Sequence, residues 1–212
     1  MDYRKEYEKW LESDYFNAAT TQELLAIKDD DKEIEDRFYR NLAFGTAGMR
    51  GKLGAGTNRI NVYMIRRATK GLADYILQKG GKERGVVIAY DSRHFSDVFA
   101  LETAKTLAAC GIKAYLFTSL RPVPVLSYAV RHLRTIAGVA VTASHNPKEY
   151  NGYKVYWEDG AQAVDEIADE IVTSVNAIED YDSIVVMDEA EAIEKGRLVY
   201  IDKEVDDAYM AD

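Results

Sequence analysis

Residues 136–147 read IAGVAV followed by TASHNP, and they decide the fold that we expect. The first six residues are apolar and partly β-branched, and such a short run is typical of a buried strand. Small polar residues and a proline follow, so they lie where the strand leaves the sheet. In open α/β sheets, ligands bind at the carboxyl edge. This stretch therefore predicts an α/β sheet with the hydroxyl of Ser144 held where a ligand can bind.

The residues after this stretch bring a lysine towards the serine. Asn151-Gly152 is typical of a tight turn, and residues 153–157 are expected to return as the antiparallel neighbour of the first strand. Such a return carries the ammonium group of Lys154 towards Ser144.

A serine hydrolase does not fit the same residues. The Gly-x-Ser-x-Gly elbow is absent around Ser144. His145 is adjacent to the serine, and neighbouring residues of an extended chain point to opposite sides. A hydrolase would need a base from elsewhere in the chain.

A second polar stretch, FGTAGMRGK, occupies residues 44–52. Its three glycines leave backbone N–H groups open to an anion, and Arg50 and Lys52 supply positive charge. It is not a P-loop, because Gly-x4-Gly-Lys-Ser/Thr is absent. The composition favours an anion site of another kind.

Helical and extended patterns alternate through the rest of the chain. The apolar spacing predicts strands at residues 85–90 and 113–118, and helices at residues 62–79, 97–109, 121–133 and 163–178. Asn61 and Ser96 are expected to cap two of these helices. Such alternation with short connections is typical of a three-layer α/β/α sandwich. The returning strand makes its sheet mixed, mainly parallel.

The two ends of the chain differ from this central pattern. Residues 1–41 are expected to form an amphipathic helical extension packed on a domain at residues 42–200. Residues 181–212 are acidic and are expected to be irregular, apart from an apolar run at 198–201, and residues 201–212 are expected to begin a linker. We expect no internal repeat.

Composition excludes several classes of protein. The chain has 212 residues, 47% of them hydrophobic, and a net charge of −9. That charge disfavours nucleic acid and anionic membranes as partners. No apolar run approaches the ~20 residues of a membrane span. The single cysteine, Cys110, excludes an internal disulfide and fits a reducing compartment.

Three motifs together resemble the phosphohexomutase family, which includes phosphoglucomutase and phosphomannomutase. TASHNP at residues 142–147, with NGYK at residues 151–154, is similar to the family's active-site serine loop. GTAGMRG at residues 45–51 is similar to its Gly-Thr-x-Gly-x-Arg-Gly signature. YDSR at residues 90–93 is similar to its Tyr-Asp-x-Arg motif, which we interpret as a brace for a loop. Val123 departs from the threonine that family members often have, so no polar role is expected there.

The resemblance implies roles for particular residues. Ser144 would carry a phosphoryl group, and the catalytic residues beside it would be Lys154, Arg50 and His145. Phosphate or substrate contacts would come from Thr46, Gly48, Lys52 and Asn146. One Mg²⁺ ion would bind Ser144 through its phosphate and carboxylates outside this chain, and a sugar 1,6-bisphosphate would be intermediate and activator.

Three further loops of the family do not occur in this sequence: Asp-Gly-Asp-x-Asp-Arg, Gly-Glu-x-Ser-Gly and Arg-x-Ser-Gly-Thr. The resemblance therefore implies the first domain of a cytoplasmic four-domain mutase, inactive alone, whose partners are a sugar phosphate and the remaining domains. The helical extension resembles the phosphoglucomutase/phosphopentomutase branch. Interconversion of glucose or mannose 1-phosphate and 6-phosphate is the expected reaction. A phosphopentomutase and a non-catalytic sugar-phosphate-binding module stay open as alternatives.

Overall fold

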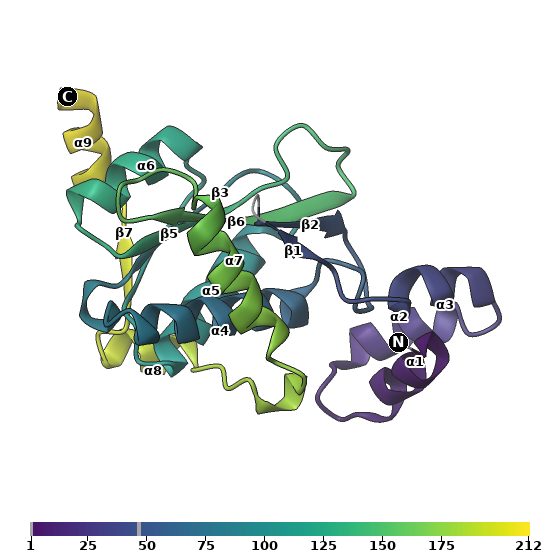
Figure 1. The fold of residues 1–212 in the computed structure, drawn as a ribbon. Coiled ribbons are helices and arrows are strands. Elements are labelled where there is room, and N and C mark those ends of the chain that lie inside the picture. Colours follow the sequence, from purple (N-terminus) through teal and green to yellow (C-terminus); the bar gives the residue numbers. More distant parts are fainter. Residues whose placement is uncertain (1, 46–47) are drawn as a thin grey trace.

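A computed structural model describes residues 2–45 and 48–212, and these residues form a seven-stranded sheet flanked by helices (Figure 1). The strands are β1 (Phe44–Gly45), β2 (Gly48–Lys52), β3 (Val86–Tyr90), β4 (Ala114–Phe117), β5 (Ala137–Val141), β6 (Tyr150–Trp157) and β7 (Leu198–Ile201). The helices are α1 (Tyr3–Glu12), α2 (Ala18–Ala26), α3 (Asp31–Phe38), α4 (Val62–Gln78), α5 (Ser96–Ala109), α6 (Val123–His132), α7 (Asp165–Asn176), α8 (Glu189–Glu194) and α9 (Lys203–Ala211).

The sheet is mixed, as the sequence predicts. Its strand order is β1-β2-β6-β5-β3-β4-β7. The strands β5, β3, β4 and β7 run parallel, whereas β6, β2 and β1 each join the sheet through antiparallel pairing. Every residue of β5 is buried, because helices cover both faces of this part of the sheet, and this is why its sequence is apolar throughout.

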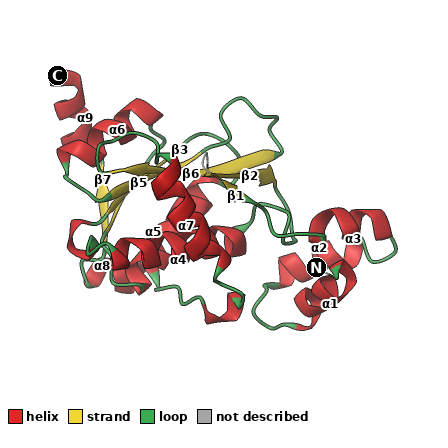
Figure 2. Ribbon diagram, in the orientation of Figure 1, coloured by secondary structure: helices red, strands yellow, loops and turns green. Residues whose placement is uncertain are grey.

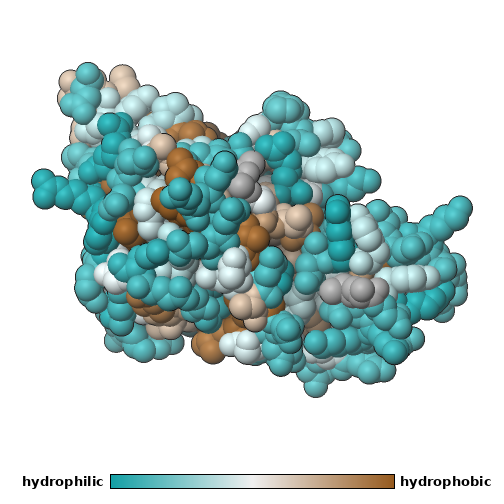
Figure 3. Space-filling model, in the orientation of Figure 1, coloured by the Kyte–Doolittle hydropathy of each residue, from teal (hydrophilic) through white to brown (hydrophobic). Residues whose placement is uncertain are grey.

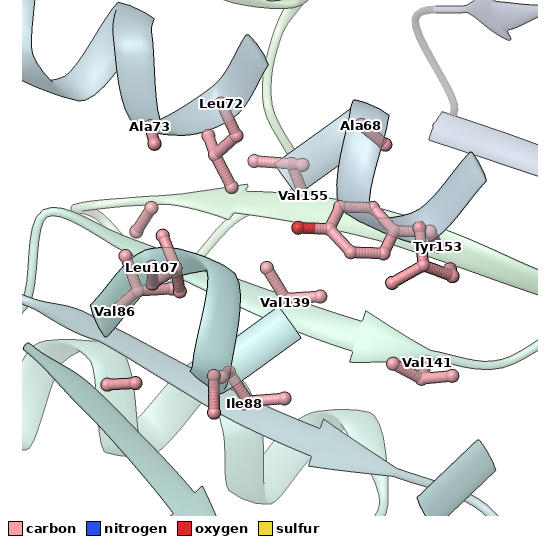
Figure 4. Close-up of a cluster of buried hydrophobic side chains, with 14 of the residues drawn as sticks. Ala68, Leu72, Ala73, Val86, Ile88, Leu107, Val139, Val141, Tyr153 and Val155 are labelled. Carbon is pink, nitrogen blue, oxygen red and sulfur yellow. The ribbon is translucent and has the colours of Figure 1, made fainter. Parts of the chain in front are cut away.

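Helices form a layer on each face of the sheet (Figure 2). On one face α4, α5 and α7 pack over the main core, part of which Figure 4 shows: Leu72 of α4 and Leu107 of α5 lie over Val139 of β5 and Val155 of β6. On the other face α6 and α9 pack over a smaller core that includes Leu126. The expected three-layer α/β/α sandwich is confirmed.

The three N-terminal helices build a separate aromatic core beside the sheet (Figure 1). Trp10 stacks on Phe16 at 4.0 Å between ring centroids, and Tyr63 of α4 packs against both rings. Arg37 of α3 bonds the carbonyl of Ala55, in the loop that follows β2, at 3.1 Å. The extension therefore packs on the sandwich at α4 and at this loop. The predicted domain boundaries stay a prediction.

The C-terminal segment has more regular structure than its acidic sequence suggests. Residues 189–211 form α8, β7 and α9 instead of the irregular chain that we expect, and β7 extends the sheet beyond β4. Val205 of α9 is buried against α6. Arg121 binds Asp202 and Asp206, which further attaches this helix to the loop before α6.

Two local expectations are wrong. Ser96 does not cap α5: Phe95 is the N-cap residue, with φ 64°, and the hydroxyl of Ser96 donates to Asp91 instead. Asn151-Gly152 is not a turn, because both residues lie inside β6 and pair with β2. The chain reverses earlier, where the N–H of Tyr150 bonds the carbonyl of Pro147. Asn61 does cap α4, accepting from the N–H of Met64.

Gly152 lies where backbone from both neighbouring strands is close. A Cβ added there would lie 2.6 Å from the carbonyl oxygen of Thr142 and 2.8 Å from that of Met49. Strand geometry, not a turn, therefore requires this glycine.

We expect Gly152→Ala to lower the free energy of unfolding by about 1–3 kcal/mol, because neither carbonyl can move without breaking the sheet. Urea unfolding of the chain measures this value. Gly45→Ala is the control: among the described residues, an added Cβ there meets only the carbonyl oxygen of Gly48, at 4.0 Å. A Gly152→Ala variant as stable as Gly45→Ala would contradict the prediction.

Candidate active site

Ser144 lies on the loop that leaves the carboxyl end of β5. Its φ is 54°, in the left-handed region, which costs a residue with a side chain roughly 1–2 kcal/mol. Its N–H donates to the hydroxyl of Thr142 at 2.9 Å. The serine is exposed, so the strained backbone presents its hydroxyl to solvent at the rim of the sheet.

Lys154 contacts that hydroxyl directly. Its Nζ donates to Oγ of Ser144 at 2.8 Å. Partial burial lowers the pKa of Lys154, and the positive charge of Arg50 lowers it further. The predicted approach of the lysine to the serine is confirmed, although β6 and not a turn at Asn151 produces it.

The strand β2 adds two more cations to the same face of the sheet. Met49 is buried in the main core, so its neighbour Arg50 faces the opposite side. Arg50 pairs in register with Gly152, and Lys154 follows two residues later on the same face of β6. Lys52 lies beyond Arg50 on the exposed side of β2. Arg50, Lys52 and Lys154 thus share one face of the sheet.

Gly48 lets β2 approach the strand that carries Lys154. It has φ 88°, and a Cβ added there would lie 2.1 Å from the carbonyl oxygen of Tyr153 and 3.0 Å from Cα of Lys154. A side chain cannot occupy that space, which explains a glycine at this position. Thr46, the other residue predicted in this stretch, lies outside the described residues.

His145 and Asn146 follow the serine on its loop. His145 is exposed. Oδ1 of Asn146 is buried and has no hydrogen-bond partner among the described residues, while the N–H of Asn146 bonds the carbonyl of Ala143. Both residues therefore lie on the same loop as Ser144, and their predicted contacts with a phosphoryl group stay predictions.

Asp91 and Thr142 form a network under the serine that sequence reasoning did not foresee. Oδ2 of Asp91 accepts from the hydroxyl of Thr142 at 2.6 Å, and its Oδ1 accepts from Ser96 at 2.9 Å. Asn151 donates to the hydroxyl of Ser96 at 3.0 Å. Two of these three bonds join residues 51 and 55 positions apart, so no local pattern in the sequence could have identified the network.

The predicted brace is confirmed. The guanidinium of Arg93 bonds backbone carbonyls of the serine loop. It therefore holds a loop and is not free to bind an anion.

Two hollows adjoin Ser144. One, of about 230 Å³, lies between the ends of β3 and β5 and the start of α6, and Asp91, Arg121 and Thr142 line it. The other, of about 330 Å³, also borders Asp91 and Ser144, and Asn146 and Lys148 line it. A small anionic molecule can therefore reach Ser144 through either hollow. Hydrophilic residues cover most of the face drawn in Figure 3, as is expected of a chain with 30% charged residues.

Across residues 2–45 and 48–212, no group of three or more His, Cys, Asp or Glu side chains could hold a metal ion. Asp91, which lines both hollows, already accepts from Thr142 and Ser96. The same ranges contain no helix that is both long and apolar enough to cross a bilayer.

A family model agrees with this geometry. Residues 41–182 match domain I, the alpha/beta/alpha domain, of phosphoglucomutase/phosphomannomutase. The chain belongs to this family. The match includes Ser144, Lys154 and Arg50.

Named relatives support the same assignment. The chain is 36% identical to a phosphoglucomutase of Staphylococcus saprophyticus over 200 residues, which are 94% of this chain and 36% of the relative. It is 39% identical over 176 residues to a phosphopentomutase of Mus musculus, covering 77% of this chain and 28% of the relative. Its structure resembles a putative phosphomannomutase from Thermus thermophilus, with a TM-score of 0.64 and 29% identity over 77% of this chain and 33% of the other. The chain thus spans about a third of the length of these relatives.

Proposed function

We propose that this chain is the part of a phosphosugar mutase that carries its phosphoryl group. In this proposal, Ser144 bears the group as an ester and transfers it to a free hydroxyl of a sugar monophosphate. The resulting bisphosphate returns its other phosphoryl group to the serine, which yields the isomeric monophosphate. The hydrogen bond of 2.8 Å from Lys154 to the serine oxygen is the observation that carries the proposal.

Lys154 is suited to the proton balance of this transfer. When the phosphoryl group moves to the sugar, the bond from Oγ of Ser144 to phosphorus breaks and the oxygen gains a proton, while the accepting sugar hydroxyl bonds to phosphorus and loses its proton. The ammonium of Lys154 can donate the proton that Oγ gains, and the neutral amine can take it back when the serine is phosphorylated again. Burial, and then the charge of Arg50, lower the pKa of Lys154, which makes its ammonium a better proton donor to Oγ.

Charge around the serine suits an anionic substrate. The whole chain has a net charge of −9, yet cationic side chains gather at this site: Arg50, Lys52, Lys148 and Lys154. Phosphoryl transfer depends mainly on positioning and on neutralising charge. We therefore propose a sugar phosphate as substrate, with Arg50 and Lys154 stabilising charge on the transferred group, and His145 and Asn146 contacting it.

A Mg²⁺ ion and further domains complete this proposal. Magnesium prefers oxygen ligands, and it would take them from a phosphoryl group on Ser144 and from carboxylates outside this chain. The chain spans 36% of the Staphylococcus saprophyticus relative, which supports the proposal that the remaining domains supply those carboxylates and the rest of the sugar site. The isolated chain is then expected to be inactive.

Mapping phosphate on the protein tests the proposal. The full polypeptide that contains this chain is incubated with glucose 1,6-bisphosphate or with ribose 1,5-bisphosphate, and peptides are analysed by mass spectrometry. We expect one phosphate at Ser144 from at least one donor, and the better donor identifies a hexose or pentose mutase. A polypeptide that binds both bisphosphates without gaining phosphate at Ser144 is a sugar-phosphate-binding module instead.

A further inference from the structure

Arg93 has an unusual set of partners for a cation beside a phosphate site. Its Nη1 donates to the carbonyls of Pro147 and Tyr150 at 2.9 and 3.0 Å. Its Nη2 donates to the carbonyls of Ser144 and Asn146 at 2.7 and 2.6 Å. Four backbone carbonyls of one short loop thus converge on one guanidinium.

Asp91, which directly follows β3, holds the rest of Arg93 in place. Nε of Arg93 lies 3.6 Å from Oδ2 of Asp91, and the N–H of Arg93 bonds Oδ1 of the same carboxylate. Only 14% of the side chain is exposed. Asp91 in turn accepts from Thr142, whose hydroxyl accepts from the N–H of Ser144. Arg93 and Asp91 therefore hold the serine residue through both its carbonyl and its N–H.

We propose that Arg93 is a positioning residue that holds the backbone of Ser144 in its left-handed conformation. It thereby keeps the hydroxyl of Ser144 within hydrogen-bonding distance of Lys154. A strained backbone conformation persists only where the surroundings determine it fully. At Ser144 those surroundings are the carbonyl bond to Arg93 and the N–H bond to Thr142. Without the guanidinium, the loop can relax to an extended conformation, which carries Oγ away from Nζ of Lys154. The consequence for phosphoryl transfer depends on the proposed function, but the clamp itself does not.

Arg93→Lys is the informative substitution. Lysine keeps the charge, but its single ammonium has three donors at one point and cannot reproduce the planar fork that reaches four carbonyls. Arg84→Lys is the matched control. Arg84 also bonds two carbonyls, those of Arg134 and Thr135, both at 3.1 Å, but these precede β5 at the other end of the sheet.

Hydrogen exchange of this chain tests the clamp without any substrate. In the wild type, the N–H groups of Ser144, Asn146 and Tyr150 are all bonded within the serine loop. We expect Arg93→Lys to speed exchange in residues 142–150 at least tenfold and to leave β3 at the wild-type rate. Arg84→Lys should leave residues 142–150 unchanged. Exchange at the wild-type rate in residues 142–150 of Arg93→Lys overturns the proposal. Faster exchange throughout β3 in both Arg93→Lys and Arg93→Gln also overturns it, because Arg93 would then stabilise the whole fold and not the serine loop in particular.

Kinetics of the full polypeptide then separates positioning from substrate binding. We expect Arg93→Lys to slow phosphate incorporation at Ser144 at least tenfold, with less than a threefold change in KM for the sugar phosphate. An unchanged rate of incorporation, or a raised KM with the rate intact, overturns the positioning role. If the wild type itself takes up no phosphate, the proposed function fails and the exchange measurement alone decides on Arg93.

Discussion

Ser144→Ala is expected to abolish mutase turnover of the full polypeptide, with a loss on the order of 10⁵-fold or more, as is found when a covalent nucleophile is removed. No other hydroxyl is hydrogen-bonded to Lys154 among the described side chains, so none is placed to replace Oγ. A coupled assay of sugar 1-phosphate conversion measures the loss, and mass spectrometry should show no phosphate at position 144.

Ser92→Ala is the control for this substitution. Ser92 lines the same hollow as Ser144 and is also exposed, but no role in the proposed transfer depends on it. Turnover in this control should stay within about twofold of the wild type, as is usual for a surface position. Near wild-type turnover in Ser144→Ala would refute the assignment of the phosphoryl carrier.

Lys154→Met is expected to lower kcat by roughly 10²- to 10⁴-fold, the usual contribution of a positioned acid or base. Methionine keeps much of the length of the side chain but can neither donate a proton to Oγ of Ser144 nor accept one. Steady-state kinetics of the full polypeptide measure the effect, and Lys195→Met, on the surface next to α8, is the control. A change in KM with kcat preserved would show that Lys154 binds the sugar phosphate without moving a proton.

The pH dependence gives an independent check on the same lysine. The phosphorylated enzyme needs Lys154 as an ammonium, so turnover should fall as pH rises through the pKa of this group. Burial lowers that pKa most, and Arg50 lowers it further by charge repulsion, so Arg50→Met removes the repulsion and should raise it. The alkaline limb of the kcat profile is then expected to move to higher pH, whatever Arg50 also contributes to binding. A shift to lower pH would contradict the proton-transfer role of Lys154.

Local sequence determined most of the sheet and pointed to the candidate site residues. Residues 136–141 are apolar throughout because β5 is buried on both faces, and that pattern is visible in one dimension. Ser144 lies on the loop that leaves this strand, so its place at the sheet edge needed no knowledge of distant residues. The positions of Arg50 and Lys154 on one face also follow from strand alternation once β2 and β6 are known to pair.

Tertiary structure decided those local conformations and contacts that depend on residues far apart in the chain. Gly152 reads as a turn residue, but two nearby carbonyls require it within a strand. Ser96 reads as a helix cap, but Asp91 accepts its hydroxyl hydrogen. The acidic C-terminal segment reads as irregular, but β4 offers an open edge to which β7 adds. Arg93 binds carbonyls 53 and 54 residues away. Propensity and periodicity act over a few residues, whereas hydrogen-bond partners at these distances exist only after the chain has folded. The sequence could therefore point to the candidate site residues but not to the residues that hold them in place.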